Sequence, residues 1–259
     1  MTADGEVRPA VEGDREAWDA FVLAEPRATF FHLCAWARAV CEEFGHRDRR
    51  LVALRAGEVV GVLPLVRCRA LRGGAPLLSS PYAVYGGPVG VDGEVERALF
   101  EAAERIAVDE RLGRLELRSL HDPGCDLPRS ELYATFIKDL PESASEVLPG
   151  MPKKARADAR RARKQHGLPL HEGRWFVADL VRLFHRNKRD LGSPGLPSSY
   201  FARLLATFPE ATTVHLVKRG SEPLAAVLSF LFRDQVLAYY SGTAQDADRS
   251  FKASAFMYM

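Results

Sequence analysis

The sequence predicts an α/β (α+β) protein built from two lobes, each combining helices with a mixed sheet. Two observations carry this prediction. Helix-like and strand-like stretches alternate along the 259 residues, and the order helix, helix, strand, strand, strand occurs twice. Apolar residues make up 47% of the chain and charged residues 27%, a composition typical of globular proteins with substantial cores. Long disordered regions are therefore not expected.

The first lobe, expected over residues 1–140, opens with two helices. The helix over 15–24 has Asp14 as its expected N-cap, and the helix over 34–44 is expected to stop at Gly45. Apolar side chains recur every three or four residues in both, at Trp18, Phe21, Val22, Trp36, Val40 and Phe44. This spacing places an apolar stripe on each helix.

Strands follow in the first lobe. Residues 50–55 and 58–66 are rich in Val and Leu and form an expected hairpin around Ala56-Gly57. Residues 77–88 mix aromatic residues with Gly and Pro, which is typical of a strand that leads into an irregular loop. A helix and two more strands are expected after this loop, over 94–110, 115–118 and 132–139.

A join between the lobes is expected over 141–150, where two Pro residues and a Gly gather. The second lobe, 151–259, begins with a basic helix over 153–166 and then repeats the element order of the first. Two helices and three strands are expected there, over 176–191, 198–208, 212–218, 224–232 and 236–242, with Ser198 as the cap of the second helix. Residues 251–259 resemble the start of another helix. We therefore expect this lobe to be incomplete, either as a natural truncation or as a fragment.

Net charge and targeting signals limit the classes of function and the cellular locations that the sequence allows. The formal net charge is +2, from 36 basic and 34 acidic residues, which argues against a general nucleic-acid coat. The polar N-terminus lacks the apolar core of a signal peptide, and no apolar run approaches the roughly 18 residues of a membrane span. We expect a cytoplasmic protein.

The four cysteines are spaced in a way that suits neither a zinc site nor a disulfide framework. No two form a CxxC pair. We expect free thiols in a reducing compartment and no bound metal. Cys34 and Cys41, seven residues apart on one predicted helix, are expected to pack into the core. The residues concerned are Cys34, Cys41, Cys68 and Cys125.

One segment carries the most specific motif, the run Asn187-Lys188-Arg189-Asp190-Leu191-Gly192-Ser193-Pro194. It resembles the N-x-R-D-L-G-T-P stretch of FemAB-like proteins associated with exosortase (PEP-CTERM) and exopolysaccharide clusters. Ser193 stands in place of Thr, and residues 195–197 read Gly-Leu-Pro in place of Val-Phe-Pro. Three further stretches agree with that family, over 59–65, 85–88 and 225–230, so the resemblance spans nearly the whole chain.

The resemblance implies tandem GNAT-like lobes, the second of the BioF2-like acetyltransferase type, and hence acyl transfer. Characterised FemAB-type proteins move an amino acid from aminoacyl-tRNA to an amine of a peptidoglycan precursor, whereas the BioF2-like branch uses acyl-CoA. The donor therefore stays open between these two co-substrates, and no permanently bound cofactor is expected. The implied acceptor is an amine on a cell-envelope or exopolysaccharide precursor, and the protein is expected to be a monomer.

The basic helix over 153–166 is the first candidate site. Seven cations stand against the single acid Asp158, and four of them share one face at i, i+4, i+7 and i+8. Such a face suits a phosphate-rich ligand such as tRNA, a nucleotide-sugar or a lipid pyrophosphate. A solvated charged helix is the alternative. The residues expected to contact the donor phosphates are Lys153, Arg156, Arg160, Arg163 and Lys164.

The motif at 187–194 is the second candidate site. Asn187 offers a donor and an acceptor, and Arg189 can hold a phosphate or carboxylate through two parallel hydrogen bonds. Asp190 is a candidate general base. The alternative is a structural pair between Arg189 and Asp190 at a helix end that is capped by Gly192.

Two aromatic segments complete the candidates. In the loop with Tyr82, Tyr85 and Gly86, the tyrosines can bond a substrate and the glycine lets a ligand approach the backbone, although a bulged strand end is the alternative. The strand end around Tyr240 resembles the GNAT strand whose backbone bonds the acyl donor, which makes Tyr240 a catalytic candidate. Alternation along a strand predicts that Tyr239 and Tyr240 face opposite sides, with one of them in the core.

The Gly-rich pyrophosphate loop of CoA-dependent GNAT enzymes is missing at its expected place, residues 247–255. Its absence lowers the expectation for CoA and raises it for tRNA or another donor. Three functions follow from the sequence. The leading one is an acyl- or aminoacyl-transferase; a catalytically degenerate scaffold for polysaccharide assembly and an RNA-binding protein are the alternatives.

Overall fold

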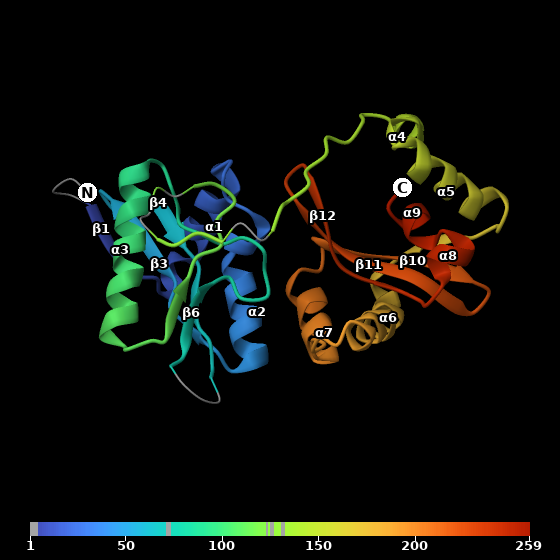
Figure 1. The fold of residues 1–259 in the computed structure, drawn as a ribbon. Coiled ribbons are helices and arrows are strands. Elements are labelled where there is room, and N and C mark those ends of the chain that lie inside the picture. The colour runs from blue at the N-terminus through green and yellow to red at the C-terminus, as the bar shows by residue number, and fades with distance from the viewer. Residues whose placement is uncertain (1–4, 71–73, 123, 125–126, 131–132) are drawn as a thin grey trace. The chain divides into compact units, whose positions relative to one another are not determined.

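The computed structural model describes residues 5–70, 74–122, 124, 127–130 and 133–259 (Figure 1). The contacts within the chain divide it into two compact units, Met1–Pro128 (unit 1) and Arg129–Met259 (unit 2). Both units combine helices with β-sheets, which confirms the predicted α/β class.

Unit 1 consists of two four-stranded sheets and three α-helices within its described residues. Its elements are β1 (Gly5–Pro9), α1 (Arg15–Ala24), α2 (Cys34–Phe44), β2 (Arg47–Asp48), β3 (Leu51–Arg55), β4 (Glu58–Leu63), β5 (Leu65–Arg67), β6 (Pro76–Ser79), β7 (Val89–Gly90), α3 (Gly93–Asp109) and β8 (Arg114–Glu116). The sheet orders are β1-β3-β4-β7 and β2-β5-β6-β8, with β6 and β8 parallel and the other pairs antiparallel.

The bounds of α1 and α2 match the prediction, and Gly45 ends α2 in the left-handed conformation with a φ of +65°. The single strand predicted over 58–66 is wrong. Pro64 divides it into β4 and β5, which join different sheets. A proline has no N–H to give to a ladder, so the chain changes sheets at this residue.

Three further local predictions fail in whole or in part. Residues 133–139 form no strand. Asp14 takes the N-cap position of α1, but its carboxylate makes no capping bond, because it accepts from the Val11 N–H at 2.7 Å and from the Arg8 guanidinium. Helix α7 begins at Ser198 itself and Pro197 takes the cap position. Short polar residues satisfy whichever neighbouring N–H lies closest, and this choice depends on the tertiary fold.

Unit 2 is built around one antiparallel sheet in the order β12-β11-β10-β9. Its elements are α4 (Ala144–Gly150), α5 (Lys153–Lys164), β9 (Leu170–Glu172), α6 (Val177–Asp190), α7 (Ser198–Thr207), β10 (Thr212–Arg219), β11 (Glu222–Phe232), β12 (Gln235–Thr243), α8 (Ala247–Phe251) and α9 (Ala253–Met257). Within this unit α6 and α7 cover one face of the sheet, and α5, α8 and α9 lie on the other (Figure 1). Alternate residues of β11, such as Ala225 and Val227, pack against the second helix group.

The cysteine prediction holds within the described residues, where Cys34, Cys41 and Cys68 are free thiols; Cys125 lies outside them. Burial raises the pKa of Cys34 and of Cys41 to about 12 and that of Cys68 to about 11. Thiols that keep their protons at neutral pH are poor nucleophiles. These residues therefore pack in the core of unit 1 and do not suit covalent catalysis.

Raised thiol pKa values predict a loss of stability at alkaline pH. The unfolded chain ionises near its ordinary thiol pKa of 9.0, whereas folded Cys34 holds its proton until about pH 12. Stability is therefore fully present below pH 9 and falls as the pH rises toward 12, by at most about 4 kcal/mol for this residue. Urea unfolding of the wild type and of Cys34→Ala between pH 8 and 11 tests this. The unfolding free energy of the wild type is expected to fall more steeply with pH than that of Cys34→Ala. Parallel pH dependences would contradict the raised pKa of Cys34.

Candidate functional site

Helix α6 lies directly against strand β12 at Gly242. A Cβ on Gly242 would lie 2.4 Å from the Phe184 backbone nitrogen, so only glycine fits there. The Asn187 side chain bonds both main-chain groups of Thr243. Its nitrogen donates to the Thr243 carbonyl at 2.6 Å and its oxygen accepts from the Thr243 N–H at 3.2 Å. These two hydrogen bonds fix the C-terminal end of β12 against α6.

Strand β12 lies at the edge of its sheet among the described strands, and it contains a bulge. Tyr240 pairs with Leu228 and Ala238 pairs with Ser229, which leaves Tyr239 as an extra residue. Backbone groups in an antiparallel strand alternate between the neighbouring strand and the open edge. Because Thr243 bonds outward to Asn187, the N–H and C=O of Ser241 also point away from β11.

The bulge changes the predicted arrangement of the two tyrosines. Their ring centroids are only 4.8 Å apart, so the prediction that they face opposite sides is wrong. Tyr240 is buried, packs edge-to-face against Phe184 and Phe201, and places its hydroxyl 3.3 Å from that of Tyr200. The extra residue, which alternation along a regular strand cannot anticipate, brings both rings together.

An open groove of about 530 Å³ lies at the C-terminal end of α6. Its lining consists of His185, Lys188, Arg189, Ser193, Gly195, Leu196 and Pro197. His185 Nε2 lies 2.6 Å from the Leu196 carbonyl and links the helix to the following loop. Gly192, with a φ of +66°, ends the helix as expected. Two cations and no carboxylate line the groove, which suits an anionic group.

Arg189 and Asp190 are both exposed on the last turn of α6. Within the described part of the chain, neither side chain forms an ion pair, so they are not the structural pair considered as the alternative. Their exposure beside the groove leaves the guanidinium and the carboxylate accessible to a ligand.

Helix α5 presents its cations to solvent. Ala159 and Ala162 are fully buried, on the side of the helix that packs toward α9. Among the described residues only one of the predicted donor-binding cations makes a side-chain hydrogen bond, from Arg156 to the Pro149 carbonyl at 3.0 Å. The exposed members are Lys153, Arg160, Arg163 and Lys164. The helix therefore carries a positive face that no described carboxylate neutralises.

The aromatic loop of unit 1 is held by internal contacts. Tyr82 has a φ of +62°, stacks on Phe44 with centroids 4.2 Å apart, and places its hydroxyl 3.3 Å from His46 Nε2. Gly86 has a φ of +148°, and a Cβ there would lie 2.2 Å from Ser80 Oγ. A close internal contact therefore explains this glycine. Tyr85 is half-buried in the same loop.

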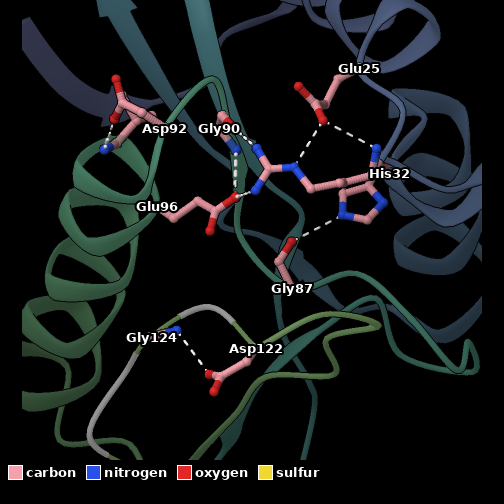
Figure 2. Close-up of polar contacts among 10 residues, drawn as sticks. Glu25, His32, Gly87, Gly90, Asp92, Glu96, Asp122 and Gly124 are labelled. Carbon is pink, nitrogen blue, oxygen red and sulfur yellow. Dashed lines mark hydrogen bonds and ion pairs between the residues drawn. The ribbon is translucent and has the colours of Figure 1, made fainter.

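A polar cluster that the sequence does not predict joins α3 and Gly87 to the segment before α2 (Figure 2). The Arg27 guanidinium bonds the Glu25 and Glu96 carboxylates and the Gly90 carbonyl. Glu96 is only 6% exposed, and burial raises the pKa of its carboxyl group although the Gly90 N–H and Arg27 oppose the shift. Partners 69 residues apart leave no local signal in the sequence.

The same cluster fixes the tautomer of His32. The Thr29 N–H donates to His32 Nδ1 at 3.0 Å, so Nε2 carries the proton and donates to the Gly87 carbonyl at 3.0 Å (Figure 2). The adjoining cavity of about 20 Å³ also reaches the buried Ser119 hydroxyl, which has no partner among the described residues. This space holds about one water molecule. The hydrogen bonds of the cluster therefore stabilise unit 1, and the adjoining cavity is too small for a substrate.

Nowhere among the described residues do three or more His, Cys, Asp or Glu side chains gather as a metal site would require. No helix among them has the length and apolar character needed to cross a bilayer.

Residues 247–255, where the resemblance puts a Gly-rich pyrophosphate loop, contain no glycine. Residues 247–255 form α8 and α9, separated by Lys252 in the left-handed conformation. The Asp248 carboxylate accepts from the Ser254 N–H at 2.7 Å and from the Ser254 hydroxyl at 2.8 Å. The exposed Asp248 carboxylate therefore satisfies an N–H in the first turn of α9.

Comparison with known proteins defines the class for part of the chain. Residues 151–259 match the family model described as Acetyltransferase (GNAT) domain. No curated protein sequence gives a match.

Solved structures extend the likeness over both units. A structure described as FemX is similar at a TM-score of 0.66 and 16% identity, covering 98% of this chain and 84% of that one. A conserved protein of unknown function from Bacteroides thetaiotaomicron VPI-5482 is similar at a TM-score of 0.56 and 14% identity, covering 97% and 84%. A tandem GNAT protein from the clavulanic acid biosynthesis pathway reaches a TM-score of 0.46 at 14% identity, covering 98% and 83%. At these identities the first two establish a shared fold.

Proposed function

We propose that the chain is an N-acyltransferase whose reacting groups lie in unit 2. It would move an acyl or aminoacyl group to an amine of a cell-envelope, exopolysaccharide or peptidoglycan-type precursor in the cytoplasm. The observation that carries the proposal is the bulged edge of β12, because it offers backbone donors beside an exposed carboxylate-bearing helix end. The match of residues 151–259 to a GNAT acetyltransferase domain supports the same class.

The proposed reaction is direct transfer in a ternary complex. The acceptor amine attacks the donor carbonyl, a C–N bond forms, and the bond to the oxygen or sulfur of the leaving group breaks. The outward N–H of Ser241 would stabilise the developing oxyanion. Asp190 would take the amine proton, and the Tyr240 hydroxyl would return a proton to the leaving group. Holding both substrates in line supplies the rest of the acceleration.

Charged and aromatic surfaces would bind the two substrates. The groove beside Arg189 would hold an anionic group of the acceptor, with Asn187 fixing its wall. The positive face of α5 would bind phosphates of tRNA or of a lipid- or nucleotide-linked precursor. Tyr82, Tyr85 and Gly86 of unit 1 are separate candidates for contact with a substrate. The protein would act as a monomer with acyl-CoA or aminoacyl-tRNA as co-substrate.

The test offers each donor with a panel of amine acceptors. Purified protein is incubated with labelled aminoacyl-tRNA or acetyl-CoA and with amino sugars, peptidoglycan-precursor peptides and lysine, and new amides are detected by mass spectrometry. Binding of tRNA that weakens with salt and is lost in the Arg156→Glu/Arg160→Glu double variant would support tRNA as donor. Absence of any new amide with every donor would contradict the proposal.

Arg189→Gln is expected to raise the KM for the acceptor by about 10- to 100-fold while kcat stays near the wild-type value, because the guanidinium contributes to substrate binding. The measurement is initial rate against acceptor concentration. Arg182→Gln is the matched control, since Arg182 lies exposed on the same helix and pairs with Asp179 away from the groove. Equal changes in both variants would contradict a role for the groove.

A catalytically degenerate scaffold for polysaccharide assembly is the second candidate. The observation that favours it is that residues 247–255, where the resemblance puts a Gly-rich pyrophosphate loop, contain no glycine. A scaffold would bind the precursor through the groove without forming an amide. Saturable precursor binding together with no turnover from either donor would select this function.

A further inference from the structure

Four large apolar side chains lie exposed close together in unit 2, in the segment 133–140. This segment forms neither helix nor strand and leads into α4 and α5 (Figure 1). The exposed fractions are 93% for Tyr133, 96% for Phe136, 77% for Ile137 and 66% for Leu140. Single exposed apolar residues are ordinary on a protein surface, but a contiguous group marks an interaction site. We call these four residues the apolar segment.

Two hydrogen bonds hold the apolar segment beside the start of α5. The Lys138 ammonium donates to the Gly150 carbonyl at 3.1 Å. In α5, the Arg156 guanidinium donates to the Pro149 carbonyl at 3.0 Å. Gly150 is the last residue of α4, and α5 follows almost at once, from Lys153. The C-terminal end of α4 therefore joins the apolar segment to the basic helix.

Helix α5 places positive charge next to this segment. Seven of its 12 residues are Lys or Arg, against the single acid Asp158. Ala159 and Ala162 take the buried side of the helix. Each basic residue close to an anionic bilayer adds attraction, and apolar side chains enter the boundary between headgroups and acyl chains. A basic helix beside exposed aromatic and aliphatic side chains is therefore a combination that fits such a bilayer.

We infer that the apolar segment and α5 together bind the surface of an anionic lipid bilayer. The cations of α5 attract the phosphate-bearing headgroups, while Phe136 and Ile137 enter the layer between headgroups and acyl chains. The inference deepens the proposed function and rests on it, since it assigns lipid phosphates to the positive face of α5. A protein held in this way meets an acceptor that is itself carried on a lipid.

The apolar segment favours a bilayer over tRNA as the partner of α5. Binding to RNA uses cations for the phosphates and aromatic rings for the bases. The aliphatic side chains of Ile137 and Leu140 serve neither purpose, whereas a bilayer removes them from water. The charge of the whole chain, 36 basic against 34 acidic residues, also fits one local basic surface better than a nucleic-acid coat.

The experiment measures flotation of the full chain with lipid vesicles at low and high salt. The probes are vesicles of phosphatidylcholine alone and vesicles of equal parts phosphatidylcholine and phosphatidylglycerol. Phe136→Ser/Ile137→Ser removes the apolar contacts. Leu23→Ser/Val108→Ser is its matched control, because both side chains are exposed and apolar but belong to helices of unit 1. Circular dichroism verifies the fold of every variant.

A second pair of variants tests the charge. Arg160→Ala/Arg163→Ala removes two exposed cations of α5. Arg182→Ala/Arg233→Ala is the control, since it removes two exposed cations of unit 2 that belong to α6 and to the turn between β11 and β12. Both double variants lower the net charge by the same amount, so any difference between them reports the position of the charge.

We expect the wild type to float with the anionic vesicles, less so as salt rises, and not with phosphatidylcholine alone. Phe136→Ser/Ile137→Ser should lower the affinity for anionic vesicles at least about tenfold. Arg160→Ala/Arg163→Ala should lower it about 10- to 30-fold. Both control variants should float as the wild type does. If the first variant does not fold, Tyr133→Ser/Leu140→Ser takes its place.

The inference is overturned if the wild type does not float, if it floats equally with both kinds of vesicle, or if the apolar variant keeps its affinity. Binding of tRNA to α5 without flotation would identify RNA as the partner. A dimer in size-exclusion chromatography that only the apolar variant dissociates, again without flotation, would identify a second copy. Failure of the proposed function looks different: the protein floats with anionic vesicles, yet no donor yields an amide.

Discussion

Asp190→Asn should lower the rate of amide formation by about 10²- to 10⁴-fold, the range that a positioned general base contributes. The amide cannot take a proton from the attacking amine, whereas the carboxylate can. The side chain lies exposed on the last turn of α6 and makes no ion pair among the described residues, so its removal should leave the fold intact. The measurement is kcat with saturating donor and acceptor, together with the thermal midpoint.

The matched control is Asp234→Asn, which changes an exposed carboxylate in the turn between β11 and β12 of the same unit. It should leave kcat within a factor of about two, as expected for a surface change away from the chemistry. A kcat for Asp190→Asn within a factor of about two of the wild-type value would remove Asp190 from the mechanism.

The elements that the sequence predicted best are those whose signal is local. Periodic apolar residues and Gly45 sufficed to place α1 and α2 at their observed bounds. Strands β10, β11 and β12 of unit 2 followed from Val- and Leu-rich runs between turns, with ends that differ by at most a few residues, whereas β9 was not predicted. Long-range pairing decided the rest. Pro64 sends two halves of one expected strand into different sheets, and no local feature predicts the sheet that each half joins.

The same difference between local signals and long-range contacts applies to the candidate site. The sequence could single out Arg189 and Asp190, because a motif of consecutive residues carries them. It could not show that the Asn187 amide bonds Thr243, 56 residues later, or that Asp248 returns onto Ser254. It also missed the ion pair of Arg27 and Glu96, which only the tertiary fold brings together. Residue type suggests which chemistry a side chain could perform. Only the tertiary contacts show which side chains are already engaged in internal hydrogen bonds and ion pairs.

Gly242→Ala should destabilise unit 2 by about 3 kcal/mol, the upper part of the range for overpacking. The added Cβ would meet backbone atoms of α6 at 2.4 and 2.5 Å, and a backbone cannot rotate away as a side chain can. Helix α6 must then move off β12, which also pulls Asn187 from Thr243 and alters the edge at Ser241. Gly150→Ala is the control within the same unit, because no atom lies within 4 Å of its added Cβ.

Chemical denaturation followed by circular dichroism gives the change in unfolding free energy, and hydrogen exchange locates it. Amides of β11 and β12 should lose protection in Gly242→Ala and keep it in Gly150→Ala. Because the close approach at Gly242 fixes the outward donors of β12, activity should fall more than the folded fraction does. Destabilisation with normal activity per folded molecule would show that this packing contact does not support the oxyanion site, and it would contradict the placement of that site at the β12 edge.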